Sequence, residues 1–147
     1  LLEWQPHILV DCTDDVQNKC LMATVAREKS LRLITVGASG GRTDPTLIEV
    51  SDLTKTSNDK LLFRVRKKLR REFGFPREGK GKFGIRAIHT PERAIFTTPD
   101  GCLTSEPRDV REGLDCAGGY GSASFVTGTF GFFAAAEAVK WYLAEYQ

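Results

Sequence analysis

The sequence has few of the residues that build metal centres and redox motifs. Its four cysteines, Cys12, Cys20, Cys102 and Cys116, form no C-x-x-C pair, which argues against a zinc ribbon and against a thioredoxin-like motif. Four cysteines in 147 residues are also too sparse for the disulfide framework of a small secreted domain. We therefore expect reduced thiols and a cytoplasmic protein, or an organellar one if the source is eukaryotic.

Other absences narrow the function classes further. The sequence has two histidines and no Ser-His-Asp or metal-ligand spacing. The glycines of residues 37–41 lack the G-x-G-x-x-G spacing of a dinucleotide-binding loop. The most apolar stretch, residues 125–139, contains Glu137 and is too short to span a bilayer, so we expect no membrane insertion.

The order of patterns along the chain predicts an α/β fold. Residues 8–10 and 31–36 are apolar runs typical of buried parallel strands, and a helical pattern lies between them, from Asp15 to about Lys29. A strand, a helix and a strand with short connections form a βαβ unit, which implies a parallel sheet with helices on its faces. Further strands are predicted at residues 47–50, 83–89 and 94–97, a loop at 102–114, and an apolar helix from about residue 131.

Basic residues gather on one predicted helix, which begins after the capping residues Ser57, Asn58 and Asp59 and ends at Gly74, and on the linker that follows it. Between positions 64 and 86, ten basic residues stand against two acids, although the whole chain has a net charge of only +2. They are Arg64, Arg66, Lys67, Lys68, Arg70, Arg71, Arg77, Lys80, Lys82 and Arg86. Such a concentration is expected for a site that binds a polyanion, and a solvated helix face is the alternative.

Three carboxylates, Asp11, Asp14 and Asp15, follow the first predicted strand. Acids at the carboxyl end of a parallel strand lie where open α/β sheets bind ligands, and their oxygens suit Mg²⁺ together with substrate phosphates. The alternative is an N-cap for the helix that follows. The two interpretations are compatible, because one carboxylate is enough for the cap.

A third feature is Cys116, which precedes Ala117, Gly118 and Gly119. Small residues let backbone N–H groups approach a substrate closely, so this thiol would suit a nucleophile if its surroundings favoured the thiolate. A buried, inert cysteine is the commoner alternative.

Several stretches together resemble one family. The segment "DCTDD…K" of residues 11–19 is similar to the D-x-x-D-N…K/R segment of the ThiF/MoeB and ubiquitin-activating superfamily. The stretch "GASGGRTDPTLIEVSDLTKTSND" of residues 37–59, "KGKFGI" of residues 80–85 and "LDCAGGYGSASFVTGTFGFFAAAEA" of residues 114–138 resemble its tRNA threonylcarbamoyladenosine dehydratase branch. The resemblance runs nearly end to end and implies a ThiF/MoeB-like, Rossmann-type fold.

The resemblance also implies an activity. Enzymes of this family are thought to use ATP to adenylate the carboxylate of the threonylcarbamoyl group on the adenosine next to a tRNA anticodon. Attack from within the same group then expels AMP and closes a ring. Asp14 matches the acid that holds Mg²⁺ and ATP, with Asp11 and Lys19 beside it. Cys116 matches a cysteine with a proposed catalytic role, and Cys102 is a second candidate.

Under this resemblance, the basic segment would be a tRNA-binding surface. The resemblance further implies a homodimer, and it allows a sulfur-transfer partner protein. The residues that we expect to contact tRNA are Arg64, Lys67, Lys68, Arg70, Arg71, Lys80 and Lys82. Two other functions stay open: adenylation of a ubiquitin-like sulfur carrier, and a non-catalytic module for RNA binding or dimerisation.

Two departures from the family pattern stand out. Asp15 replaces the usual Asn after the metal-binding acid, which adds negative charge beside ATP. The superfamily's glycine-rich phosphate loop normally lies upstream of the D-x-x-D segment, and here only ten residues precede Asp11. We therefore expect a single portion of a ThiF-like domain, its C-terminal half, over residues 1–147, which would not adenylate a substrate alone.

Overall fold

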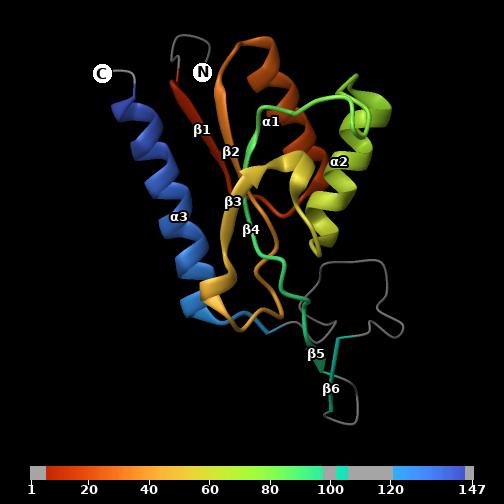
Figure 1. Ribbon diagram of the computed structural model, residues 1–147, viewed down its shortest axis with the longest axis vertical. Helices are drawn as coiled ribbons and strands as arrows, with labels where there is room; N and C mark the ends of the chain where they lie inside the picture. The colour runs from red at the N-terminus through yellow and green to blue at the C-terminus, as the bar shows by residue number, and fades with distance from the viewer. Residues whose placement is uncertain (1–5, 98–101, 106–120, 145–147) are drawn as a thin grey trace.

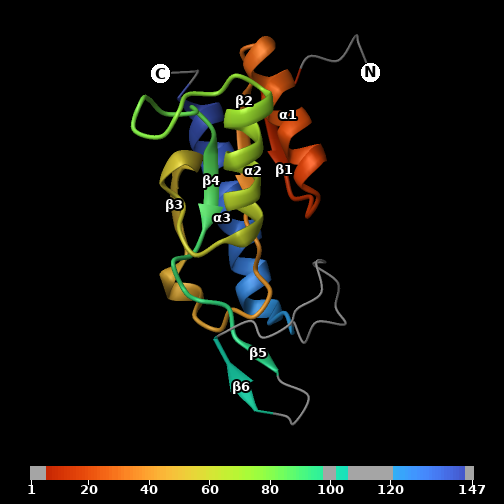
Figure 2. The same ribbon diagram turned by 90° about the vertical axis from the view of Figure 1, so that its right-hand side faces the viewer.

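The computed structural model describes residues 6–97, 102–105 and 121–144, which form three layers. A four-stranded sheet lies in the middle, formed by β1 (Ile8–Asp11), β2 (Arg32–Val36), β3 (Glu49–Asp52) and β4 (Arg86–His89). Helices α1 (Val16–Glu28) and α2 (Lys60–Glu72) cover one face, and α3 (Ser124–Leu143) covers the other (Figures 1 and 2). Two single-turn helices, η1 (Pro45–Leu47) and η2 (Leu53–Lys55), flank β3.

The strands are arranged in the order β1-β2-β4-β3, and the first three are parallel. Strand β3 pairs with β4 in the antiparallel sense. Strands β5 (Phe96–Thr97) and β6 (Leu103–Thr104) form a separate two-stranded sheet at one end of the molecule. This architecture confirms the predicted α/β fold, with a mostly parallel sheet and additional strands.

Neighbouring residues of the central strands face opposite layers, as the period of two in a strand requires. Leu33 packs in the core between the sheet and helices α1 and α2, and Ile34 packs in the core beneath α3. Helix α2 contributes Leu62, Val65 and Leu69 to the first core, at helical spacing. Because both faces are covered, the central strands consist of continuous apolar runs rather than alternating residues.

Three predicted boundaries are wrong. The strand expected at residues 83–89 begins only at Arg86, because the carboxylate of Asp52 accepts hydrogen bonds from Phe83 N (3.2 Å) and Gly84 N (2.8 Å) and holds that segment in a turn. The strand expected at residues 47–50 begins at Glu49, after η1. Of the loop expected at 102–114, the structure describes residues 102–105, which contain β6, and the remainder lies outside the described residues.

The start of the C-terminal helix also differs from the prediction. We expected it near residue 131, and α3 begins at Ser124. Gly128 and Gly131 therefore lie inside the helix, although glycine disfavours a helix interior. Val126 and Phe130 are almost fully buried against the sheet, and this packing stabilises the first two turns.

Within the described ranges, no helix is both long enough and apolar enough to cross a membrane.

Candidate functional site

In the acidic loop that links β1 to α1, the neighbouring residues Asp14 and Asp15 have different roles. The Asp15 carboxylate accepts a hydrogen bond from Asn18 N (2.7 Å) and caps α1. Asp14 is exposed, and among the described residues no group donates a hydrogen bond to its carboxylate. The N-cap is therefore Asp15, which leaves Asp14 available to a ligand.

Asp11 and Lys19 form a buried ion pair beneath this loop. Lys19 Nζ donates hydrogen bonds to Asp11 Oδ2 (3.0 Å), Thr35 Oγ1 (3.1 Å) and the Val36 carbonyl (2.8 Å), which uses all three of its N–H bonds. The other oxygen of Asp11 accepts from the backbone N–H (3.0 Å) and the hydroxyl (2.7 Å) of Thr13. Both side chains are essentially inaccessible to solvent, so the pair fixes the loop that carries Asp14 to the ends of β1 and β2.

Asp14 lines a cavity of about 260 Å³ at the carboxyl ends of these two parallel strands, which we call the Asp14 cavity. Its wall is formed by the acidic loop, the small residues of the turn after β2, one residue of α2 and the segment before α3. These residues are Cys12, Thr13, Asp14, Gly37, Ala38, Ser39, Gly40, Leu61, Gly121 and Ser122. The cavity occupies the crevice where open α/β sheets bind ligands.

The turn after β2 is held tightly against α2. Asp59 caps α2 by accepting from Leu62 N (2.8 Å), and its second oxygen accepts from Ala38 N (2.9 Å). A Cβ at Gly37 would lie 2.2 Å from that second oxygen, so only glycine fits there. Gly41, with φ of +70°, joins the turn to the segments before β5 and α3 through its backbone bonds with Ile95 and Gly121.

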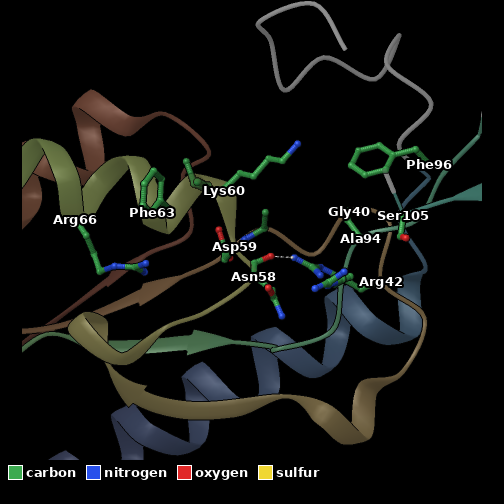
Figure 3. Close-up of a pocket in the computed structure, with 13 residues that line it drawn as sticks. Gly40, Arg42, Asn58, Asp59, Lys60, Phe63, Arg66, Ala94, Phe96 and Ser105 are labelled. Atoms are coloured by element: carbon green, nitrogen blue, oxygen red, sulfur yellow. Dashed lines mark hydrogen bonds between the residues drawn. The ribbon is translucent and has the colours of Figure 1, made fainter. Parts of the chain in front are cut away.

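A second cavity of about 410 Å³, which we call the basic cavity, opens on the other side of this turn (Figure 3). It contains four cationic side chains and two aromatic rings: Arg42, Lys60, Arg66, Arg93, Phe63 and Phe96. Asp59 also lines it. The two cavities share Ala38, Gly40 and Leu61, so they are neighbours across a wall of three residues.

Three of the seven basic residues predicted to contact tRNA form ion pairs with acidic side chains. Lys68 (3.3 Å) and Arg71 pair with Glu72, and Arg70 lies 3.9 Å from Glu78. The other four, Arg64, Lys67, Lys80 and Lys82, are exposed, and no described acid pairs with them. Helix α2 places Lys60, Arg64, Lys67 and Arg71 at spacings of four, three and four residues, so these four side chains lie along one exposed face.

The cysteines have distinct surroundings. Cys116 lies outside the described residues, so its predicted role stays a prediction. Cys102 is exposed just before β6, and Cys12 is exposed at the Asp14 cavity. Burial raises the pKa of the Cys20 thiol to about 11, which marks it as an inert core residue.

Sequence reasoning missed most of the basic cavity. Arg42, Arg93, Phe63 and Phe96 come from separate segments, and no local pattern connects them. One signal was available: Arg42 directly follows the glycine turn of residues 37–41, at the same edge of the sheet as Asp14.

Among the described residues, no group of three or more His, Cys, Asp or Glu could enclose a metal ion. An exposed carboxylate at a cavity instead suits Mg²⁺, which takes one or two protein carboxylates and completes its shell with phosphates and water. Asp14 fits that requirement.

A mostly parallel sheet between helical layers, with an acidic loop at the strand ends, defines an α/β protein of the ThiF-like, Rossmann type. No family model matches the chain. It is 35% identical over 139 residues to tRNA threonylcarbamoyladenosine dehydratase of Escherichia coli (strain K12), covering 93% of this chain and 52% of that protein. The dehydratase of Haemophilus influenzae is 37% identical over 132 residues, covering 89% of this chain and 48% of that protein.

Solved structures with the same fold as this chain come from the same family as these relatives. TcdA (CsdL) superposes with a TM-score of 0.81 at 32% identity, covering 95% of this chain and 51% of that one. The structure of E. coli TcdA in complex with ATP gives a TM-score of 0.78 at 30% identity, covering 98% and 51%. The resemblance predicted from the sequence is confirmed: this chain is homologous to about half the length of tRNA threonylcarbamoyladenosine dehydratases.

Proposed function

We propose that this chain is part of an ATP-dependent tRNA threonylcarbamoyladenosine dehydratase. The observation that carries the proposal is the position of Asp14, in the D-x-x-D segment that resembles that family's, exposed at a strand-end cavity while Asp15 caps the helix. The similarity to dehydratases over nine tenths of the chain, and to one solved with ATP, supports the same assignment.

In this reaction, a carboxylate oxygen of the threonylcarbamoyl group attacks the α-phosphate of ATP, and pyrophosphate leaves. A second atom of the same group then attacks the adenylated carbonyl, which closes a ring and releases AMP. Asp14 would hold Mg²⁺, which neutralises phosphate charge when bound. The buried pair of Asp11 and Lys19 would keep the Asp14 loop in place, a positioning role rather than direct contact with ATP.

The exposed face of α2 and the linker after it would bind the tRNA backbone. Arg64, Lys67, Lys80 and Lys82 offer cations without described acidic partners, so their contacts with phosphates would release counterions and make the affinity depend on salt. Such a substrate would place the protein in the cytoplasm or in an organelle that contains tRNA.

Cys116 is our first candidate for a catalytic thiol and Cys102 the second. Because relatives span about twice the length of this chain, we further propose that the glycine-rich phosphate loop of the nucleotide site belongs to residues outside it. Residues 1–147 would then be one portion of a ThiF-like domain, and the isolated chain would not adenylate a substrate.

The test is AMP release by the intact protein with ATP, Mg²⁺ and tRNA that carries threonylcarbamoyladenosine. We expect AMP release together with the loss of one water from the modified nucleoside. Unmodified tRNA is the control and should give neither. AMP release that requires a ubiquitin-like carrier protein and ignores tRNA would contradict the proposal and favour the sulfur-carrier function, whereas tRNA binding without any AMP release would favour the non-catalytic module.

We also propose that the protein is a homodimer that pairs through α3. Six exposed residues of this helix recur at alternating spacings of three and four, which is the seam pattern of paired helices: Phe125, Gly128, Phe132, Ala135, Val139 and Tyr142. We call them the outer α3 stripe. Phe132, at 77% exposure, is its most exposed large residue.

A further inference from the structure

Residues 77–84, which we call the basic loop, are fixed to the body of the protein at both ends. The ring of Phe75, just before the loop, and the ring of Phe83, near its end, lie with their centroids 5.0 Å apart. Helix α2 contacts both parts as well, because the guanidinium of Arg70 lies 5.4 Å from the centre of the Phe83 ring and its Nη1 lies 3.9 Å from Glu78 Oε2. These contacts close the segment into a compact loop beside α2.

A carboxylate from the sheet binds the last two residues of the basic loop. Asp52, at the end of β3, accepts hydrogen bonds from Phe83 N (3.2 Å) and Gly84 N (2.8 Å). It also caps η2, because it accepts from Thr54 N (2.9 Å) and Thr54 Oγ1 (2.6 Å). Burial would raise the pKa of Asp52, but these hydrogen bonds outweigh it and hold the pKa below its usual value. The carboxylate is therefore ionised at neutral pH, and its charge strengthens each bond.

A second aspartate shows that a helix cap alone does not require the bonds to the loop. Asp44 caps η1 in the same D-x-T pattern, by accepting from Thr46 N (2.8 Å) and from the Thr46 hydroxyl. Among the described residues, no other segment donates a hydrogen bond to the Asp44 carboxylate. The bonds from Phe83 and Gly84 are thus additional to the cap, and they fix the end of the basic loop.

The basic loop exposes Lys80 and Lys82, and no described acid pairs with them. It also contains three glycines, and a glycine-rich segment that became ordered only on binding would lose affinity through the entropy of ordering. We propose that Asp52 is a positioning residue for RNA: it holds the basic loop in one conformation and so presents Lys80 and Lys82 to phosphates of the RNA backbone. This inference rests on the proposed function, which makes the loop part of the tRNA-binding surface.

The test is the affinity of the intact protein for a tRNA transcript, measured without ATP, in wild type and in Asp52→Asn. Asparagine keeps one oxygen to cap η2 and presents an amide group where the second oxygen accepted a loop N–H. We expect Asp52→Asn to weaken binding about tenfold, because two lysine side chains and their loop are no longer ordered in advance.

The direction of this change separates positioning from simple electrostatics. Removal of a negative charge near a site for a polyanion should by itself strengthen binding. Asp44→Asn removes the same charge from the other D-x-T cap, so it is the matched control, and we expect it to bind tRNA at least as tightly as wild type. Equal weakening by Asp44→Asn and Asp52→Asn would overturn the proposal.

A double-mutant cycle shows whether Asp52 acts through the lysines. Lys80→Ala together with Lys82→Ala should weaken binding and reduce the slope of log affinity against log salt concentration by about 2. Adding Asp52→Asn to that variant should cause no further loss. Amide hydrogen exchange at Phe83 and Gly84 should be faster in Asp52→Asn than in wild type, because their acceptor has changed.

Several outcomes would overturn the positioning role. They are an equal loss from Asp52→Asn with and without the two lysines, unchanged affinity or unchanged amide exchange in Asp52→Asn, and a wild-type affinity that does not depend on the lysines. These measurements need no ATP. Normal AMP release with any of these outcomes would count against the positioning role alone, whereas the expected binding results without AMP release would count against the proposed function alone.

Discussion

Asp14 and Asp15 have the same chemistry and different tasks, because only one of them points back toward the first turn of α1. The Asp15 carboxylate bonds Asn18 N at 2.7 Å, whereas Asp14 lines a cavity. The local pattern, without the family resemblance, left the cap and the metal site as alternatives for both residues. The difference between them depends on backbone geometry at the end of β1, which side-chain identity does not encode.

The two aspartates should therefore respond differently to substitution. Asp14→Asn should lower AMP release by roughly 100-fold, because it removes the carboxylate that would hold Mg²⁺, and should leave the free energy of unfolding nearly unchanged. Asp15→Ala should cost about 1 kcal/mol of stability through loss of the cap and keep most of the activity. Steady-state kinetics and urea unfolding check both variants. A reversal of the two outcomes would show that the assignment of cap and ligand is wrong.

Lys19 stabilises the fold only together with Asp11. Lys19→Met should lower the free energy of unfolding by about 3–5 kcal/mol, because it leaves a buried carboxylate without its charge partner. The double variant Lys19→Met with Asp11→Asn should recover much of that loss, since no unpaired charge remains. Urea denaturation of the two variants provides the measurement, and a double variant less stable than Lys19→Met would contradict this account.

His89 should make the free energy of unfolding depend on pH. It is buried at the end of β4, with Nε2 2.8 Å from Ser51 Oγ, and burial lowers its pKa despite the opposing charge of Glu49. The unfolded chain therefore binds a proton more readily than the folded one once the pH falls below the unfolded value of about 6.5. The free energy of unfolding should decrease between pH 7.5 and 5.5, and His89→Asn should flatten that decrease. An unchanged slope in the variant would contradict the assignment.

At the scale of elements, replacement of a glycine by alanine should change the stability of the protein in opposite directions at two positions. Gly37→Ala should destabilise the protein by about 1–3 kcal/mol, because its Cβ would displace the Asp59 oxygen that bonds Ala38 N. Gly131→Ala, in the exposed interior of α3 with no atom within 4 Å of the added Cβ, should stabilise it by about 1 kcal/mol. Thermal unfolding of both variants checks the signs. Equal effects would mean that the turn after β2 can move.

The elements also show what local patterns can predict. The βαβ unit of residues 8–36 follows from apolar runs separated by a helical period, and the structure confirms it. The start of α3 does not follow from local pattern, because the buried residues Val126 and Phe130 outweigh the glycines between and after them. The segment before β4 likewise depends on hydrogen bonds from Phe83 and Gly84 to the distant Asp52, which no local period reveals.

At the scale of the whole molecule, local sequence patterns lead to one of the two cavities and not to the other. The sequence predicts Asp14 as a site residue because its motif and the strand that precedes it are continuous in sequence, and the structure places Asp14 at a cavity. The basic cavity was not identified, because Arg42, Lys60, Arg93 and Phe96 meet only after β2, α2 and β4 are packed together. Convergence of separate segments is a tertiary property, so charge and aromatic content along the chain indicate it only indirectly.

The outer α3 stripe leads to a prediction about assembly. Phe132→Glu should convert a dimer into a monomer, because a charge would be buried at the centre of the helix pair. Sedimentation equilibrium should give twice the chain mass for wild type and for the control Arg64→Glu, and a single chain mass for Phe132→Glu. Wild type with the mass of one chain would contradict homodimerisation, and dimeric Phe132→Glu would exclude α3 as the interface.

The thin wall of Ala38, Gly40 and Leu61 between the two cavities has an energetic consequence. Ligands held in the two cavities would contact the same turn, so a ligand that shifts this turn would change the free energy with which the other cavity binds its own ligand. Such coupling is reciprocal: whatever factor a ligand in the Asp14 cavity contributes to the affinity of the basic cavity, a ligand in the basic cavity must return to the affinity of the Asp14 cavity. The turn after β2 would then couple the occupancy of the two cavities.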